Sequence, residues 1–469
     1  MRFPVAASKK IRGALMHAAL AFGLSFACLA LSAERGAAIE PETGEPKPAT
    51  SAGILPIPDY GGDFWSRSHL SGDWLGYRTK LAELGVQFEI DSVSWIDRVV
   101  SGGASKDSEP GGNVTYNLKW DLMRSGLIPG ALIQVRAESR FGSSGNVNTG
   151  DVTPSNSAAL SPTNYSAPDD GYDIALTQLS YTQMFSEHFG VTLGKLDLYG
   201  EGTPSEFAGG RGRTQFASWN LNFSTPALFV PASTIGGGVV VLPNENLTIT
   251  SLVISGTDCT HSDCFEDLDD KGGVSLNTVS YQYVLGDLPG GVNGSFFYFF
   301  DKDFTDLGST TIGLGDGAIG LRGSKKSNSW QVSGSFWQYL FVEETREGPL
   351  DLLDGQPDLE GWGIFASLSF ADPDTNPWQT SVAFGVGGRG IIPGRPNDLF
   401  GLGGFYNDLA SSRLNEDSGY EDDYAGMEAF YNFFITPAVR LSAVAQYLPS
   451  VRPGIDDTLM LSGRLQFVF

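Results

Sequence analysis

Three ionisable side chains stand at alternate positions in one short segment: Arg136, Glu138 and Arg140. A period of two is that of a β-strand, so a strand over 132–141 would place all three on one face. Stacked charges of both signs can form a ladder of salt bridges that stiffens a sheet. They can also donate hydrogen bonds to the hydroxyls of a neutral solute and accept hydrogen bonds from them. The residues alone leave both readings open.

The same alternation elsewhere adds further candidates. In 114–122, Lys119 and Asp121 alternate with apolar residues, which predicts a strand with one polar face. Trp219, beside Asn220, offers an aromatic ring that could stack on the flat face of a sugar; a place in a membrane-interface belt is the alternative. The remaining charged candidates on polar strand faces are Lys195, Asp197, Arg440 and Arg464.

The elements that must position these residues are strands. In the last eleven residues, 459–469, apolar residues occupy alternate positions and the chain ends on Phe469. A soluble sheet can alternate in this way, but an aromatic carboxy-terminal residue favours a barrel whose apolar face meets lipid. In such a barrel the charges must face the lumen, because Lys or Arg at the bilayer midplane costs about 2–4 kcal/mol.

Strand-like segments separated by Gly, Pro and Asp turns recur from residue 86 to the end of the chain. Their number predicts an all-β fold: a closed antiparallel transmembrane β-barrel of about 16 strands. Before the first strand, Trp74, Tyr77 (or Arg78), Leu81 and Leu84 have helical spacing and predict a short amphipathic helix. With both termini in the periplasm, Thr436-Pro437 is a tight periplasmic turn. The polar stretch 142–170 is then an external or lumen-folded loop.

The amino-terminal region predicts export. Basic residues precede an apolar run from about Gly13 to Leu31, and small residues follow, so we expect 1–33 to be a cleaved signal peptide; a membrane anchor is the alternative. We expect 34–67 to be a Pro- and Ala-rich periplasmic lead-in and 68–469 to form the barrel. The formal net charge of −24 would become −28 on loss of the four basic residues of the leader, and such acidity argues against nucleic acid.

Cys259 and Cys264 are close in sequence, and in an exported protein they predict a disulfide in an external loop. Zinc binding by these cysteines with His261 is the alternative. Beyond the leader the chain has three histidines, none in a convincing nucleophile constellation, and it has no phosphate-binding or dinucleotide motif. We therefore expect no enzyme activity, no cofactor and no metal.

Three parts of the chain together resemble a known family, the OprB carbohydrate-selective porins. Residues 72–78 (Gly-Asp-Trp-Leu-Gly-Tyr-Arg) resemble the amino-terminal motif of that family, with Leu75 where glycine is usual and a further departure at Tyr77. Residues 393–398 with 401–403, and the closing hairpin from Glu428, are similar to two later family segments. The resemblance implies a 16-stranded outer-membrane barrel that passes monosaccharides such as glucose by passive diffusion. It also implies a monomer rather than a trimer, with Trp74 and Arg78 at the periplasmic mouth.

The leading hypothesis is an outer-membrane channel for small carbohydrates, in contact with lipid on its outer surface. A general or ion-selective diffusion porin is the nearest alternative. A soluble exported β-sheet protein that binds carbohydrate is an alternative from another class, and a barrel used for surface attachment is a third.

Overall fold

The computed structural model describes residues 53–160, 174–200, 205–265, 272–315, 318–344, 349–350, 356–410 and 419–469. The predicted signal peptide and most of the predicted lead-in lie outside these residues. Within the described part, no helix is both long enough and apolar enough to cross a membrane.

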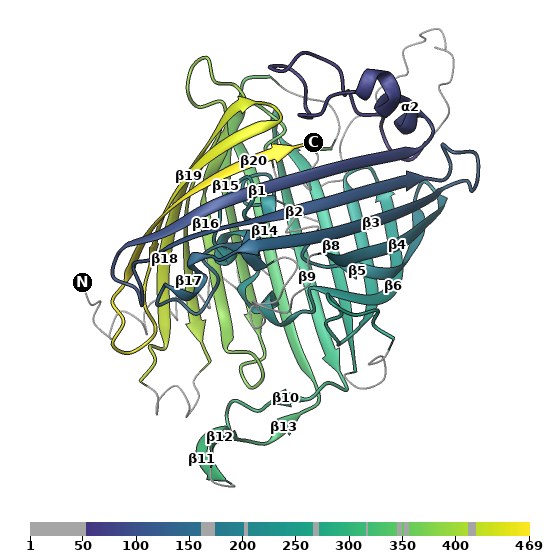
Figure 1. Ribbon diagram of the computed structural model, residues 1–469. Coiled ribbons are helices and arrows are strands. Elements are labelled where there is room, and N and C mark those ends of the chain that lie inside the picture. The colour runs from purple at the N-terminus through teal and green to yellow at the C-terminus, as the bar shows by residue number, and fades with distance from the viewer. Residues whose placement is uncertain are drawn as a thin grey trace. The chain divides into compact units, whose positions relative to one another are not determined.

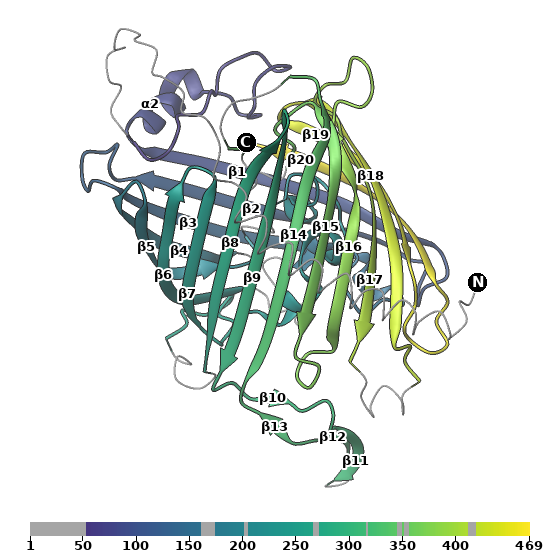
Figure 2. The same cartoon turned by 180° about the vertical axis from the view of Figure 1, so that it is seen from behind.

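Sixteen of the described strands form one closed antiparallel barrel, as the alternation predicts (Figures 1 and 2). Each strand pairs with its neighbour in chain order, and β20 closes the barrel on β1 with Asp91 opposite Val468. The strands are β1 (Val86–Ser101), β2 (Ser108–Asp121), β3 (Ala131–Gly142), β4 (Ala175–Ser186), β5 (Phe189–Asp197), β6 (Ser233–Asn244), β7 (Leu247–Ser255), β8 (Gly273–Leu285), β9 (Leu288–Phe300), β14 (Ser329–Val342), β15 (Gly361–Ala371), β16 (Trp378–Arg389), β17 (Leu399–Leu409), β18 (Asp423–Thr436), β19 (Val439–Leu448) and β20 (Thr458–Val468).

Alternate side chains of the strands point outward and inward. On β20, Leu459 and Leu461 are exposed on the outer face, whereas Arg464 and Gln466 are buried on the inner face. Met460 is an apolar residue on the inner face, and its sulfur lies 4.0 Å from the Ser155 hydroxyl of a loop inside the barrel. The polar face therefore faces the interior, as a barrel in lipid requires.

The connections differ in length at the two ends of the barrel. The end that holds the start of β1 and the end of β20 has the tight turns 187–188, 245–246, 286–287 and 437–438, together with the longer connections 122–130, 343–360 and 390–398. The other end has the long connections 143–174, 198–232 and 301–328; the last contains two small sheets, of β10 (Phe304–Thr305) with β13 (Lys325–Lys326) and of β11 (Thr311–Gly315) with β12 (Ala318–Arg322) (Figure 2). Since outer-membrane barrels have short periplasmic turns and long external loops, we assign the first end to the periplasm.

Two stretches of these long connections, 143–160 and 205–232, fold into the barrel, and we call them the inner loops. They carry η2 (Gly145–Val147), η3 (Ser157–Leu160), η4 (Gly210–Gly212), α3 (Trp219–Asn222) and η5 (Thr225–Phe229). Most of their residues are buried, although loops on a surface would be exposed. Phe216 packs on Phe430 of β18 with ring centroids 4.9 Å apart, and Phe207 packs on Tyr339 of β14 at 4.8 Å. The inner loops therefore share an apolar core with the wall formed by β14–β18.

The amino-terminal segment lies against the seam where the barrel closes. It carries η1 (Trp74–Gly76) and α2 (Tyr77–Glu83), the helix that the sequence predicts (Figure 1). Arg78 is buried and donates hydrogen bonds to the carbonyl oxygens of Phe88 at 2.6 Å and Phe469 at 3.0 Å. It thereby joins α2 to both sides of the closing seam.

We predict that a positive charge destabilises the barrel far more at one residue of β3 than at the residue next to it. Val135 pairs with Leu118 and Leu179 on the outer face, so Val135→Arg should lower the free energy of unfolding in lipid vesicles by about 2–4 kcal/mol. Gln134 faces the water-filled interior at the same depth, so Gln134→Arg should change it far less. Urea titration followed by tryptophan fluorescence measures both variants, and equal destabilisation would show that the two faces are wrongly assigned.

Candidate functional site

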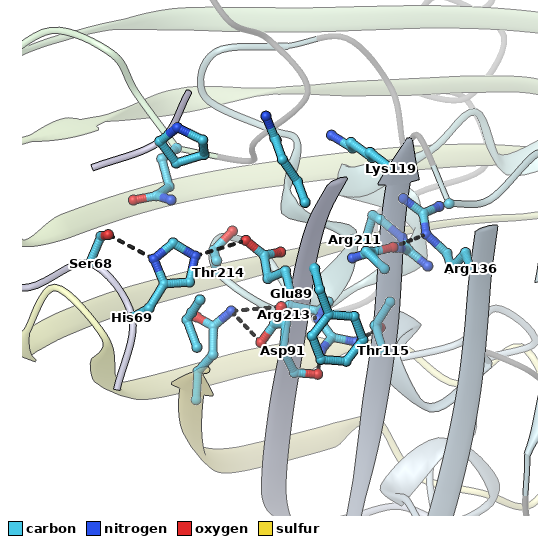
Figure 3. A pocket seen from close by; sticks show the side chains of 18 of the residues that line it. Ser68, His69, Glu89, Asp91, Thr115, Lys119, Arg136, Arg211, Arg213 and Thr214 are labelled. Carbon is cyan, nitrogen blue, oxygen red and sulfur yellow. Dashed lines mark hydrogen bonds and ion pairs between the residues drawn. The ribbon is translucent and has the colours of Figure 1, made fainter. Parts of the chain in front are cut away.

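A polar cavity of about 560 Å³ opens inside the barrel, next to β1, β2 and β3 (Figure 3). An inner loop bounds it on one side and the amino-terminal segment bounds it at the periplasmic end. The side chains and backbone that line it come from Pro58, Tyr60, Ser68, His69, Gln87, Phe88, Glu89, Asp91, Thr115, Asn117, Lys119, Gln134, Arg136, Gly200, Gly210, Arg211, Arg213, Thr214, Gln356, Arg440, Gln466 and Val468.

The strand register arranges the wall of this cavity in rows. Residues paired across antiparallel strands point to the same side, so each row carries one inward side chain from each of β1, β2 and β3. The three rows are Gln87–Lys119–Gln134, Glu89–Asn117–Arg136 and Asp91–Thr115–Glu138. Hydrogen-bond donors and acceptors thus alternate over a small area of wall.

An inner loop is clamped onto this wall by two arginines. Arg213 donates from Nε to Asp91 Oδ2 at 3.0 Å and from Nη1 to the Thr115 hydroxyl at 2.9 Å. Arg211 donates from Nη2 to Glu138 Oε1 at 2.9 Å, and the Glu138 side chain is fully buried. The clamp fixes how closely the loop approaches the wall, and therefore the width of the cavity.

The three charges at 136, 138 and 140 do not pair with one another. Glu138 binds Arg211, and Arg140 donates to the carbonyl oxygen of Ala159, so both hold inner loops. Arg136 lines the cavity, donates to Asn117 Oδ1 at 2.9 Å and lies 3.5 Å from a carboxylate oxygen of Asp197. Salt bridges are present, but instead of forming a ladder along β3 they join Glu138 to an inner loop and Arg136 to the end of β5.

Lys119 and Asp121 both face inward from β2 and serve different purposes. Lys119 extends into the cavity, and in the part of the chain that the structure describes no hydrogen bond or ion pair of its ammonium group is seen (Figure 3). Asp121 is buried near the rim and accepts hydrogen bonds from the backbone N–H groups of Ile54 at 2.6 Å and Leu55 at 3.0 Å. Asp121 therefore ties down the amino-terminal segment.

The inward charges of the closing strands also meet the inner loops. Arg464 is buried and donates to the carbonyl oxygens of Gly212 and Gln215. Glu428, which the sequence analysis did not select, accepts from the N–H groups of Ala217 at 2.6 Å and Ser218 at 2.8 Å. Arg440 lines the cavity, with its guanidinium 4.5 Å from the ring centroid of Phe434.

Trp219 and Asn220 lie in α3, inside the barrel and away from the membrane interface. Trp219 is 1% exposed and stacks on Phe223 with ring centroids 4.3 Å apart. The amide of Asn220 donates to Thr153 at 2.7 Å and accepts from Asn407 at 2.9 Å. Neither residue lines the polar cavity, so their contacts stabilise the inner loops.

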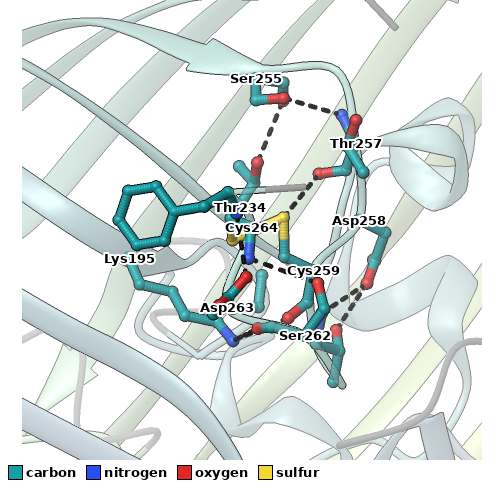
Figure 4. The surroundings of a disulfide bond; sticks show 12 residues. Lys195, Thr234, Ser255, Thr257, Asp258, Cys259, Ser262, Asp263 and Cys264 are labelled. Carbon is teal, nitrogen blue, oxygen red and sulfur yellow. Dashed lines mark hydrogen bonds between the residues drawn. A yellow bond between two sulfur atoms is a disulfide. The ribbon is translucent and has the colours of Figure 1, made fainter. Parts of the chain in front are cut away.

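Lys195 does not face the lumen as the sequence pattern predicts. It shares the outer face of β5 with Leu193, which is exposed, and its ammonium donates to the carbonyl oxygens of Cys259 at 2.7 Å and Ser262 at 2.8 Å (Figure 4). These carbonyls belong to the loop in which Cys259 and Cys264 form a disulfide. The loop at the rim supplies the polar partners that a lysine on this face needs.

The sequence analysis missed several cavity residues: His69, Glu89, Asp91, Arg211 and Arg213. Glu89 and Asp91 alternate with the apolar residues Phe88 and Ile90, so the period of two in the first strand could have found them. His69 contacts Glu89, with Nε2 3.4 Å from Oε2, and its Nδ1 lies 2.8 Å from the Ser68 hydroxyl. Arg211 and Arg213 lie in a loop without periodicity, where no local pattern points to the wall.

The comparisons with known proteins agree with this architecture. The family model described as "Carbohydrate-selective porin, OprB family" matches residues 105–469. The chain is similar to the high-pH structure of Pseudomonas putida OprB, at 18% identity over 87% of this chain and 100% of that chain, with a TM-score of 0.69. The low-pH structure of the same protein matches at 13% identity over 86% and 99%, with a TM-score of 0.52. At these identities the two structures support the fold. No curated protein sequence matches the chain.

We predict that loss of the Glu138–Arg211 ion pair widens the channel. The Glu138 carboxylate is fully buried and holds Arg211 at 2.9 Å. Its neutralisation weakens this contact between the wall and the loop, so in Glu138→Gln the inner loop should leave the wall. Single-channel conductance in a planar bilayer should rise, and the exchange Glu138→Arg with Arg211→Glu should partly restore it. Lys325→Ala is the matched control, because Lys325 and Asp303 form an exposed pair in an external connection. Unchanged conductance in Glu138→Gln would contradict the clamp.

We predict that Asp151 makes the seating of its inner loop depend on pH. Burial raises the pKa of Asp151 from 3.8 to about 6, against hydrogen bonds from Thr153 that lower it. Because the seated loop has the higher pKa, the stabilisation is complete below about pH 3.8 and is lost as the pH rises through about 6. Fluctuations of the open-channel current should therefore become more frequent above pH 6 in the wild type but not in Asp151→Asn. An equal pH dependence in both proteins would exclude Asp151 as its source.

Proposed function

We infer that this chain, which belongs to the OprB family of carbohydrate-selective porins, selects its solute in the polar cavity beside β1, β2 and β3. The protein is a multi-pass β-barrel of the outer membrane and forms a channel for carbohydrates. We propose that the solutes are monosaccharides such as glucose, and that the chain acts as a monomer without enzyme activity. We further propose that it is exported by a signal peptide over 1–33.

The arrangement of charges in the cavity supports a neutral solute. Three of its four arginines meet carboxylates: Arg213 binds Asp91, Arg211 binds Glu138, and Arg136 lies near Asp197. Pairing of this kind leaves little net charge to attract an ion. The nitrogens and oxygens that remain accessible can replace the water that a sugar hydroxyl loses.

The size and openness of the cavity fit passage better than tight binding. A volume of about 560 Å³ lies within the range of small-molecule sites and accommodates a sugar together with water. A channel needs binding that is strong enough for entry and weak enough for release. An open wall on which polar and charged side chains predominate among the lining residues meets that requirement.

The contacts divide the candidate residues into two groups with different functions. We propose that Lys119, Arg136, Gln134 and Glu89 contact the sugar, because their side chains border the cavity. Glu138, Arg140, Trp219, Asn220 and Arg464 are proposed as positioning residues that hold the inner loops, and Asp197, at the end of β5, is proposed to orient Arg136. The observation that carries the proposal is the three-row polar wall with an inner loop clamped against it.

We predict that glucose at millimolar concentration reduces the single-channel current of the reconstituted protein, and that Lys119→Gln weakens this block. A lost charge-assisted hydrogen bond should raise the half-blocking concentration about 10-fold, equivalent to about 1.4 kcal/mol. The measurement is a glucose titration of the current in a planar bilayer at fixed salt.

Lys106→Gln is the matched control, because Lys106 is an exposed lysine in the connection between β1 and β2, away from the cavity. Its block should equal that of the wild type. A current that no sugar affects would favour a general porin over a selective one. Equal block in Lys119→Gln and the wild type would remove Lys119 from the proposed contact residues.

A further inference from the structure

The helix α2 exposes its apolar residues to the surroundings and turns Arg78 and Ala82 toward the barrel. Tyr77, Leu81 and Leu84 follow one another at helical spacing and are 64%, 40% and 64% exposed. Arg78 and Ala82, on the other side of the helix, are buried. A helix that packs on its own protein usually buries its apolar stripe. Here the stripe lies on the opposite side from the barrel contacts.

Leu75, just before the helix, strengthens this observation. Its side chain is 98% exposed, and its backbone is left-handed with φ of 60° and ψ of 33°. A leucine pays a steric penalty in that conformation, which glycine avoids. A side chain that is almost fully exposed gains nothing within the chain to offset this penalty.

The apolar stripe is continuous with the lipid-facing surface of the barrel. The carbonyl oxygen of Leu84 accepts a hydrogen bond from the Ser125 hydroxyl at 2.7 Å, and the same hydroxyl accepts one from Trp120 Nε1 at 2.9 Å. Trp120 belongs to the outward face of β2, opposite in parity to Lys119. Leu127 and Ile128, in the turn that holds Ser125, are also exposed. An apolar surface therefore runs from the wall of the barrel, across the rim, onto α2.

We propose that α2 is an interfacial anchor that lies in the phospholipid headgroup region of the periplasmic leaflet, with Leu75, Leu81 and Leu84 inserted toward the acyl chains. Tyr77 and Trp74 then occupy the depth at which aromatic side chains are enriched in membrane proteins. Lys80, whose ammonium lies 5.5 Å from the centroid of the Tyr77 ring, can extend to a lipid phosphate while its aliphatic part stays in the interface.

The anchor has a consequence for the channel entrance. Residues 58–69 precede the helix, and Tyr60 and His69 of this segment border the cavity at its periplasmic end. Arg78 joins the helix to the seam of the barrel and lies 4.3 Å from the centroid of the Tyr60 ring. Lipid on one side and Arg78 on the other would hold the segment at the mouth. This inference rests on the barrel being in the membrane and is independent of which sugar passes.

The test is spin-label accessibility in the full chain, reconstituted in phosphatidylethanolamine–phosphatidylglycerol vesicles. Single cysteines at Leu75, Leu81 and Glu83, in a Cys28→Ser background, carry a nitroxide, and Cys259 and Cys264 stay paired. At Leu75 and Leu81 we expect the ratio of oxygen to nickel-chelate collision rates to be several-fold higher than at Glu83. Glu83 is the matched control, because it is an exposed residue of the same helix outside the apolar stripe.

Two results would overturn the proposal. Equal, water-like collision rates at all three positions would show that α2 is in solvent. Low collision rates with both reagents at Leu75 and Leu81 would show that protein covers the stripe, either a second copy or the amino-terminal residues of the same chain. Only protein that migrates as folded barrel on unheated gels is measured, so that misfolded variants cannot imitate either result.

Discussion

The structure depends on one constraint: within the hydrocarbon layer, a strand can place charged side chains only on its inner face. Hydrocarbon offers no hydrogen bonds, so every backbone N–H and C=O must pair within the sheet, and the sheet must close. Closure of β20 on β1 satisfies this requirement for all sixteen barrel strands of the described chain. The same constraint puts the alternating polar residues inside, where antiparallel register arranges them as rows. The inner wall of the cavity is thus polar because the outer surface of the barrel faces lipid.

The wall then determines how the inner loops fold. Buried charges are costly unless hydrogen bonds compensate them, and the lumen-facing charges are compensated mainly by loop backbone. Glu428 accepts from two N–H groups of one inner loop, and Arg464 donates to two of its carbonyls. Arg213 approaches from the loop side and binds Asp91 on the wall. The inner loops contain only short helical turns. Several of their backbone N–H and C=O groups therefore form hydrogen bonds with side chains of the barrel wall.

Local pattern was sufficient to predict the barrel and insufficient to predict the site. The period of two gave the strands, their approximate number and the outward face, since these depend on neighbouring residues. Helical spacing at Trp74–Leu84 likewise gave α2. The function of Glu138 depends on Arg211, 73 positions away, and that of Arg464 depends on a loop 252 positions away. No short-range signal encodes such pairs. For the same reason, alternation alone assigned Lys195 to the lumen, although loop carbonyls at the rim satisfy it on the outer face.

The position of the cavity follows from the second inner loop, 205–232, which has aromatic residues on one side and arginines on the other. Its aromatic residues Phe207 and Phe216 pack against β14, β15 and β18, where the inner wall is apolar. Burial of this surface pulls the loop to that side of the lumen. Its arginines Arg211 and Arg213 then point to β1–β3, where the inner wall is polar. The apolar contact closes one side of the barrel, and the charged contacts hold the loop at a fixed separation from the other. Water and solute are therefore confined to the polar side, so the charged rows border the passage because the aromatic residues have filled the rest.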